Sequence, residues 1–216
     1  METLYTFGLL AITSFFTLIN PLGTMPIYMS MTQTLDSKAR KRIARKSVLV
    51  AFATILAFAF SGQLLFQFFG ISINSLRIVG GVIFFLMGQD MLQARLGHFK
   101  HDNKDATINA YINDISITPL AIPMICGPGA ITNAIILMED ANTFAHKVVL
   151  ILSIALIMAL TYIILISSSK ISQKLGDTGN KVLMRLMGLI VMVIAVEFFF
   201  SGLKPIVAEM IKSVRL

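Results

Sequence analysis

The chain has 216 residues, of which 56% are hydrophobic and 13% are charged, and its net charge is +7. Soluble domains carry roughly twice that share of charged residues, so the composition excludes an ordinary soluble globular protein. The basic residues gather in a few connections between apolar segments, which argues against nucleic acid as the reason for the positive charge. The single cysteine, Cys126, excludes an internal disulfide and a cysteine-rich metal site.

The first apolar segment, residues 3–35, contains no charged side chain but is interrupted by Asn20-Pro21-Leu22-Gly23-Thr24-Met25-Pro26. Within so much apolar sequence, this motif predicts a helix that is broken inside a membrane. Backbone groups freed by such a break must line a protein-buried or watery cavity, because hydrocarbon cannot solvate them. Asn is a favoured N-cap and Pro a favoured first helical residue, so Asn20-Pro21 predicts the start of a second half-helix.

Two further spans follow. Residues 47–69 have no ionisable side chain, and the ionisable side chains of residues 73–92 are those of Arg77 and Asp90. Each segment has about the 20 residues that a spanning helix needs. The polar residues of the following stretch predict a cytoplasmic loop over 96–114.

The fourth apolar segment, residues 115–138, is again interrupted, by Thr118-Pro119 and by Gly127-Pro128-Gly129. Both motifs predict the start of a half-helix. Residues 148–169 and 186–203 complete six predicted spans, and Glu197 is the only ionisable residue in the last of them.

Alternate connections are basic, which predicts that they face the cytoplasm and that both termini lie outside it. No basic leader precedes the first span, so we expect no cleaved signal. The C-terminal residues Lys204, Lys212 and Arg215 conflict mildly with this orientation, and the first connection outweighs them. Binding of lipid headgroups by residues 38–46 is the alternative reading of that cluster. The predicted orientation rests on these basic residues: Lys38, Arg40, Lys41, Arg42, Arg45, Lys46, Arg95, Lys100, Lys104, Lys170, Lys174, Lys181 and Arg185.

The two halves of the chain share a pattern. Arg77-x-x-Gly80 followed by Gln89 matches Arg185-x-x-Gly188 followed by Glu197 at an offset of 108 residues, and Asn20-Pro21 matches Gly127-Pro128 at 107. Because each unit has three spans, an odd number, the second unit must enter the membrane in the opposite orientation to the first. The match therefore predicts a 3+3 inverted-topology repeat. Chance convergence of common membrane residues is the alternative. We expect one all-α membrane domain over 1–216, with repeats at 1–95 and 115–216.

The two breaks predict a shared binding site. Free amides at a half-helix start carry a partial positive charge that suits a carboxylate, and glycine lets a ligand approach the backbone. The alternative is that the prolines only kink the two spans. The predicted binding residues are Asn20, Pro21, Gly23, Thr24, Thr118, Gly127, Pro128, Gly129, Thr132 and Asn133.

Ionisable residues inside a membrane are costly, and so they are functional candidates. Glu197 lies 12 residues after Arg185, which is roughly 18 Å along a helix. Glu197 either carries a coupling proton or forms an ion pair with Arg77, and symmetry adds Gln89 and Arg185 to this set.

No enzymatic motif is evident. The three histidines, His98, His101 and His146, fall in predicted loops, and the sequence has no HExxH, Gly-x-Ser-x-Gly or P-loop pattern. We therefore expect no catalytic residue, metal or cofactor, and any energy for transport must come from a gradient or a partner.

The motif Asn20-Pro21-Leu22-Gly23-Thr24-Met25-Pro26-Ile27 resembles the first-span signature of the MarC family of bacterial inner-membrane proteins. Thr118-Pro119-Leu120-Ala121-Ile122-Pro123 with Gly127-Pro128-Gly129-Ala130-Ile131-Thr132 resembles its fourth-span signature, and Arg185-Leu186-Met187-Gly188-Leu189 followed by Glu197 also fits. The resemblance implies a six-span protein of the bacterial inner membrane. It also implies transport, because some relatives are described as transporters of small neutral amino acids such as glycine and alanine.

Together these observations predict a secondary transporter that moves a small neutral amino acid with a proton or a sodium ion by alternating access. A channel-like pore for small solutes and a non-transporting membrane scaffold or assembly factor remain the alternatives. The sequence leaves the oligomeric state open.

Overall fold

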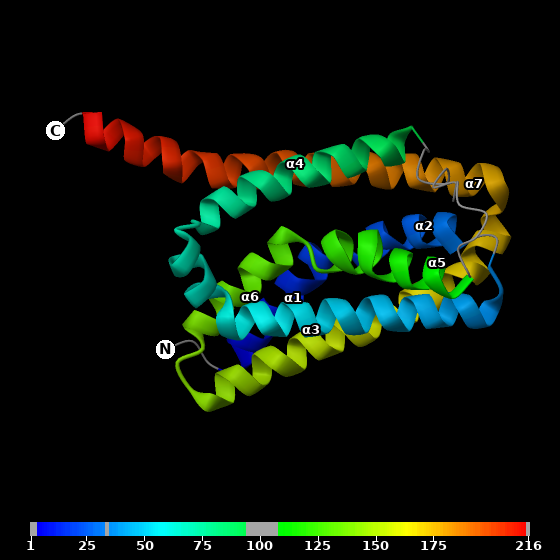
Figure 1. Cartoon of the computed structure of the whole chain (residues 1–216), viewed down its shortest axis with the longest axis horizontal. Helices are drawn as coiled ribbons and strands as arrows, with labels where there is room; N and C mark the ends of the chain where they lie inside the picture. The colour runs from blue at the N-terminus through cyan, green and yellow to red at the C-terminus, as the bar shows by residue number, and fades with distance from the viewer. Residues whose placement is uncertain (1–3, 33–34, 94–107, 215–216) are drawn as a thin grey trace.

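The computed structural model describes residues 4–32, 35–93 and 108–214, and within these ranges every regular element is a helix (Figure 1). Five helices are long and apolar enough to cross a membrane, and the count is six when one bent helix pair is taken as a single span. The prediction of an all-α membrane protein is therefore confirmed, with five to six candidate spans.

The first half of the chain contains helices α1 (Leu4–Ile19), α2 (Pro21–Thr32), α3 (Ser37–Phe69) and α4 (Ile73–Leu92). Side-chain caps begin the two long helices: the Asp36 carboxylate accepts from the Ala39 amide at 2.9 Å, and the Ser72 hydroxyl accepts from the Ser75 amide at 3.0 Å. Such caps satisfy backbone donors that have no partner within the helix. The basic cluster of residues 38–46 thus forms the first turns of α3, ahead of its apolar portion.

The next segment contains α5 (Ile108–Ile115), the π-type helix η2 (Ser116–Ile125) and α6 (Pro128–Asp140). Residues 112–125 and α6 meet at an angle of 58°. Helix α5 lies at the end of the range predicted as a loop. That part is helical because Ile112 and Ile115, which lie three residues apart, both pack into the core. Arg95, Lys100 and Lys104, which entered the orientation argument, lie outside the described residues.

The last element, α7 (Phe144–Val214), reverses direction at Gly176 and so provides two candidate spans, Phe144–Ser168 and Thr178–Lys212 (Figure 1). Gly176 has a φ of +64°, a conformation that glycine adopts readily because it has no Cβ.

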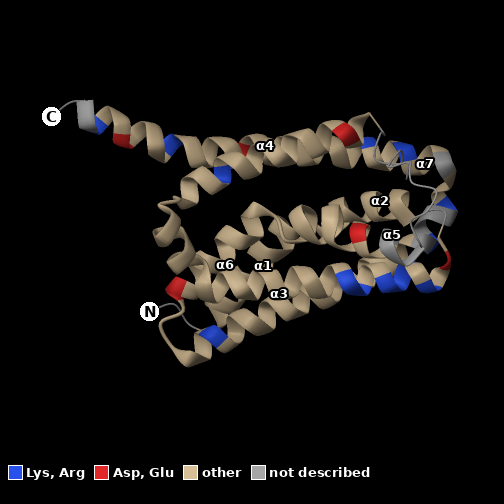
Figure 2. Cartoon of the chain, viewed as in Figure 1, with Lys and Arg blue, Asp and Glu red and all other residues tan. Residues whose placement is uncertain are grey.

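The spans form two bodies that lie side by side in Figure 1. The first body, which we call the bundle, contains α1, α2, α3, α5, η2, α6 and the first span of α7, and it holds fully buried side chains such as Phe15, Ile43 and Ile154. The second body, which we call the seam pair, contains α4 and the second span of α7 in antiparallel contact. Both termini lie at one end of the molecule, and Figure 2 shows basic residues gathered at the other end, where α3 begins.

A row of small residues joins the two helices of the seam pair. A Cβ atom on Gly81 would lie 2.7 Å from the Ala195 carbonyl oxygen, one on Gly88 would lie 2.8 Å from the Gly188 carbonyl oxygen, and one on Gly202 would lie 2.5 Å from the Asn74 carbonyl oxygen. These contacts recur every seven residues on both helices, the spacing of a left-handed helix pair. Small residues allow membrane helices to approach to backbone contact, so the seam fixes the register of α4 against α7.

Replacing Gly88 with alanine should destabilise the protein. The new Cβ would press on the Gly188 backbone, which cannot move aside as a flexible side chain would, and such overpacking costs about 1–3 kcal/mol. Thermal unfolding in detergent measures this effect. Val82→Ile adds one methylene to an exposed position of the same helix and should leave the midpoint unchanged; equal midpoints for the two variants would contradict a tight seam.

Candidate functional site

The first interruption of the sequence lies at Asn20, between α1 and α2. Asn20 has a φ of +45° and is the only non-glycine residue of the described ranges with a positive φ. Asn tolerates this left-handed conformation better than most residues because its short polar side chain can bond locally. Here the Asn20 Oδ1 atom accepts from the Gly23 amide at 3.1 Å.

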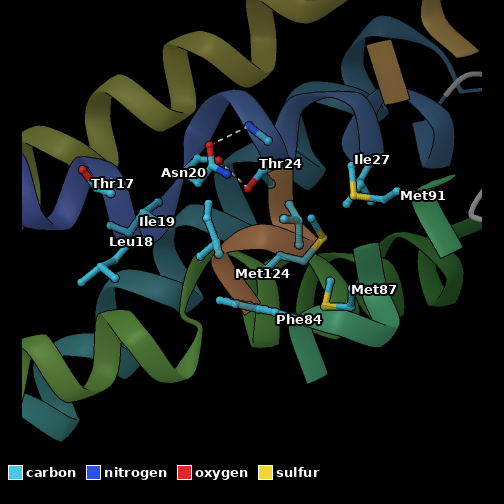
Figure 3. A pocket seen from close by; sticks show the side chains of 13 residues that line it. Thr17, Leu18, Ile19, Asn20, Thr24, Ile27, Phe84, Met87, Met91 and Met124 are labelled. Atoms are coloured by element: carbon cyan, nitrogen blue, oxygen red, sulfur yellow. Dashed lines mark hydrogen bonds between the residues drawn. The ribbon is translucent and has the colours of Figure 1, made fainter. Parts of the chain in front are cut away.

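The carbonyl group of Asn20 makes two further hydrogen bonds. Its carbonyl oxygen accepts from the Thr24 amide at 3.1 Å and from the Thr24 hydroxyl at 3.2 Å (Figure 3). The amides of Gly23 and Thr24 are therefore both occupied by Asn20. Most of the hydrogen-bonding capacity at the start of α2 is used within this short segment, which makes the kink a well-defined structure.

A cavity opens beside this kink, between the bundle and the seam pair (Figure 3). It leaves about 40 Å³ in which the centre of a water molecule can move, enough for a few waters or a solute of similar size. No lining side chain is charged, and the polar ones belong to Thr17, Asn20 and Thr24. The apolar part of the lining comes from α1, α2, α4, η2 and α7: Leu18, Ile19, Ile27, Phe84, Met87, Met91, Met124, Val191 and Ile194.

The second interruption ends at Gly127, where α6 begins with Pro128 at its first helical position. No side chain from the described ranges caps this helix, and the Ile131 amide donates to the Gly127 carbonyl at 3.0 Å. Among the described residues, the amides of Gly129 and Ala130 have no acceptor, although both residues are buried. A buried helix N-terminus without partners is unusual, because each unpaired donor costs free energy.

A third polar group lies close to this terminus. The Thr132 hydroxyl, in the second turn of α6, is buried and has no hydrogen-bond partner in the described part of the chain. Thr132 and the amides of Gly129 and Ala130 therefore place three unsatisfied groups within the first two turns of one helix.

The start of α6 lies directly behind the wall of the cavity. A Cβ atom on Gly127 would lie 2.6 Å from Cζ of Phe84, and one on Gly129 would lie 3.1 Å from Cδ2 of Leu18. Phe84 and Leu18 also line the cavity. One layer of side chains thus separates the cavity beside the first interruption from the helix that follows the second.

Three of the predicted binding residues line the cavity, namely Asn20, Gly23 and Thr24. Asn133 contacts a different partner, since its Nδ2 atom donates to the Ser14 hydroxyl at 2.9 Å and links α6 to α1. Five more residues of the set are buried, one at the start of α2 and four within or just before the first two turns of α6: Pro21, Gly127, Pro128, Gly129 and Thr132.

Thr118 is not among the residues that line the cavity. Its backbone is extended, with φ −124° and ψ 120°, and its side chain is exposed. The structure thus has an extended residue at Thr118 within η2, and the longer half-helix of this segment begins at Pro128. The proline ring disfavours the helical region for the residue that precedes it, so Thr118 is extended.

The four polar residues predicted for coupling lie on the seam pair, and none of them lines the cavity. Within the described ranges no ion pair joins Arg77 to Glu197, and the Glu197 side chain is exposed. The register of the seam sets Glu197 of α7 at nearly the depth of Arg77 on α4, and by the same register Arg185 at nearly the depth of Gln89.

The sequence did not point to the cavity residues of the seam pair. Phe84, Met87, Met91, Val191 and Ile194 are apolar residues in apolar spans, so no polar motif distinguishes them. One usable signal was present: Gly81 and Gly88, like Gly188 and Gly202, are spaced by multiples of seven residues. That spacing predicts a close helix pair and thereby the face of each helix that meets its partner.

Comparison with known proteins assigns the family. Residues 5–207 match the sequence profile of the MarC family integral membrane proteins. The chain is 37% identical to the UPF0056 membrane protein YvbG of Bacillus subtilis, over 93% of this chain and 96% of that protein. It is 38% identical to the UPF0056 membrane protein PH0760 of Pyrococcus horikoshii, over 94% and 97% of the two chains.

A third relative, the UPF0056 membrane protein YhcE of Escherichia coli, is 30% identical over 88% of this chain and 89% of its own length. No solved structure matches the chain significantly. Relatives occur in archaea as well as in bacteria, so the family is wider than the bacterial group named from the motifs. The chain belongs to the MarC family of multi-pass integral membrane proteins.

Proposed function

We propose that this protein is a secondary transporter of a small neutral solute, with small neutral amino acids such as glycine and alanine as the expected substrates. The observation that carries the proposal is the small uncharged cavity between the bundle and the seam pair, beside the kink at Asn20. A ligand site at the interface of two bodies can open to either side of a membrane when the bodies move relative to each other, as alternating access requires.

The size and polarity of the site support a small zwitterion. The centre of a water molecule can move through only about 40 Å³ of the cavity, so a bound solute must be small. An isolated ion would lose its hydration without a charged partner, which is costly. A zwitterion instead needs acceptor oxygens for its ammonium group, which Thr17 and Thr24 carry, and donors for its carboxylate.

The start of α6 supplies such donors. The unpaired amides of Gly129 and Ala130 carry the positive end of the helix dipole, and the Thr132 hydroxyl lies one turn further along. A carboxylate bound there would satisfy groups that are otherwise buried without partners. In this proposal the kink at Asn20 and the start of α6 bind opposite ends of one small molecule.

The proposal includes a 3+3 inverted repeat in one membrane domain of a bacterial inner membrane, with both termini outside the cytoplasm. The antiparallel packing of α4 against the second span of α7 supports it, because an inverted repeat relates these two spans. A proton or sodium gradient would drive transport, and Glu197, Arg77, Gln89 and Arg185 are the candidates for coupling. The proposal assigns no enzymatic activity and no cofactor.

Uptake by the purified protein in liposomes tests the proposal. We expect saturable accumulation of labelled glycine or alanine under an imposed proton or sodium gradient, together with exchange against unlabelled solute inside. Flux that neither saturates nor exchanges would indicate the channel-like pore. No gradient-dependent flux for a panel of small amino acids would contradict transport and favour a membrane scaffold.

A further inference from the structure

We propose that Phe84 and Phe198 form a partition that closes the start of α6 off from the cavity, and that both are therefore residues of the binding site. This inference rests on the proposed function for its substrate, but the partition itself can be tested without transport. Neither residue carries a polar group, and the sequence motifs of the two interruptions include neither of them.

The contacts of the two rings place them against the first residues of α6, where Leu18 of α1 also contacts Gly129. Cζ of Phe84 lies 2.6 Å from the position of a Cβ on Gly127, and the ring of Phe198 contacts the corresponding position on Gly129. The two rings meet edge to face with their centroids 6.3 Å apart. On its other side, Phe84 lines the cavity together with Met87 and Met124 (Figure 3).

The two glycines make this covering possible. Any side chain at Gly127 would overlap Phe84, and any side chain at Gly129 would overlap Phe198, so the rings lie directly against the α6 backbone. Glycine at these positions thus has a physical reason that differs from ligand approach. In this structure the space beside each glycine is filled by an aromatic ring, and the ligand reaches the amides when the rings are displaced.

The cost of the closed arrangement favours displacement by a ligand. The amides of Gly129 and Ala130 and the Thr132 hydroxyl are buried and have no partner among the described residues, and a buried polar group without a hydrogen bond is unfavourable. A carboxylate that replaced the rings would pair with these donors. The partition therefore covers a site that a polar solute can bind better than the phenylalanines do.

The seam makes the two rings move together. Phe84 lies on α4 between Gly81 and Gly88, and Phe198 lies on α7 between Ala195 and Gly202, so both are carried by helices in backbone contact. The same pair meets α6 at Gly80, where a Cβ would lie 2.5 Å from Cβ of Pro128. A shift of the seam pair away from Pro128 would withdraw both rings from the start of α6.

Access to a cysteine at the start of α6 tests the partition. The experiment uses the full chain with Cys126→Ser, which removes the only native thiol, and with Ala130→Cys, at a fully buried position whose amide is one of the unpaired donors. The rate of modification by a small water-soluble methanethiosulfonate is measured in proteoliposomes. Phe84→Ala should raise that rate at least tenfold.

Phe85→Ala is the matched control, because it removes the same side chain from the next residue of α4, on the exposed face of the helix. Equal rates for Phe84→Ala and Phe85→Ala would overturn the partition. Phe84→Leu replaces the ring with a smaller apolar side chain, and it provides a second test should the alanine variant fold poorly. It should give a smaller increase in the same direction, and a rate equal to that of Phe84 would also overturn the proposal.

The outcome separates the two proposals. Faster modification with no uptake of any solute would support the partition and contradict the transporter. Gradient-driven uptake with unchanged modification would support the transporter and contradict the partition. If both the partition and the transporter proposals hold, Phe84→Ala should also admit larger amino acids. The measurement is leucine uptake relative to glycine uptake, which should rise in Phe84→Ala and stay unchanged in Phe85→Ala.

Discussion

Replacing Asn20 with alanine should destabilise the protein more than replacing it with glycine. Alanine loses the bond from Oδ1 to the Gly23 amide, which is worth about 0.5–2 kcal/mol for a helix cap. It also meets the steric cost of a left-handed φ, roughly 1–2 kcal/mol for a residue with a Cβ and no local polar bond. Glycine loses the side-chain cap but adopts the left-handed φ freely, and as a cap residue it costs only a few tenths of a kcal/mol.

Thermal unfolding in detergent should therefore rank wild type first, Asn20→Gly slightly lower, and Asn20→Ala lowest. Asn142→Ala removes the same side chain from an exposed position near the end of α6 and should leave the midpoint unchanged. A glycine variant as unstable as the alanine variant would show that φ is not the source of the effect. A helix that continued straight through residue 20 would instead tolerate alanine better than glycine.

Thr132→Val should stabilise the protein and weaken transport. Valine has nearly the shape of threonine but carries no hydroxyl. The substitution therefore removes a buried polar group without a partner, and such a group lowers the stability of the fold by about 1–3 kcal/mol. If the hydroxyl bonds to the solute, the half-saturation concentration for uptake should rise about tenfold, since 1.4 kcal/mol is a factor of ten. Unfolding midpoints and uptake kinetics measure the two effects separately.

Ser47→Ala is the control for this prediction. The Ser47 hydroxyl is also fully buried without a partner, but Ser47 lies on α3 and does not line the cavity. Its removal should raise the midpoint and leave uptake kinetics unchanged. Equal loss of uptake in both variants would indicate a general effect on packing, and no loss in Thr132→Val would remove Thr132 from the site.

The sequence predicted the membrane class and the spans well, because charge-free runs of about 20 residues have few other structural solutions. It predicted the kink at Asn20 from one cap residue and one proline. It named two starts of a half-helix in the fourth segment, Thr118-Pro119 and Gly127-Pro128, because local rules do not choose between two X-Pro motifs that lie close together, and α6 begins at the second of them. It also extended a loop over α5, where burial against the rest of the bundle makes a short segment helical.

The site was predicted only in part, for a physical reason. Polar and helix-breaking residues are conspicuous in an apolar sequence, so Asn20, Gly23 and Thr24 could be identified. The opposite wall consists of Phe84, Met87, Met91, Val191 and Ile194. These residues resemble every other apolar residue of their spans, and only the pairing of α4 with α7 brings them to the cavity.

That pairing also constrains how the protein is made. The contacts of α4 are completed by a segment that lies about a hundred residues later in the chain, so α4 enters the membrane well before its partner is synthesised. At about 5–20 residues per second, the delay is roughly 5–20 seconds. During this time the glycine-rich face of α4 is open to lipid and to quality-control proteases. Nascent chains that stop before Gly188 should therefore be degraded faster than chains that extend beyond Gly202, although both contain the complete bundle.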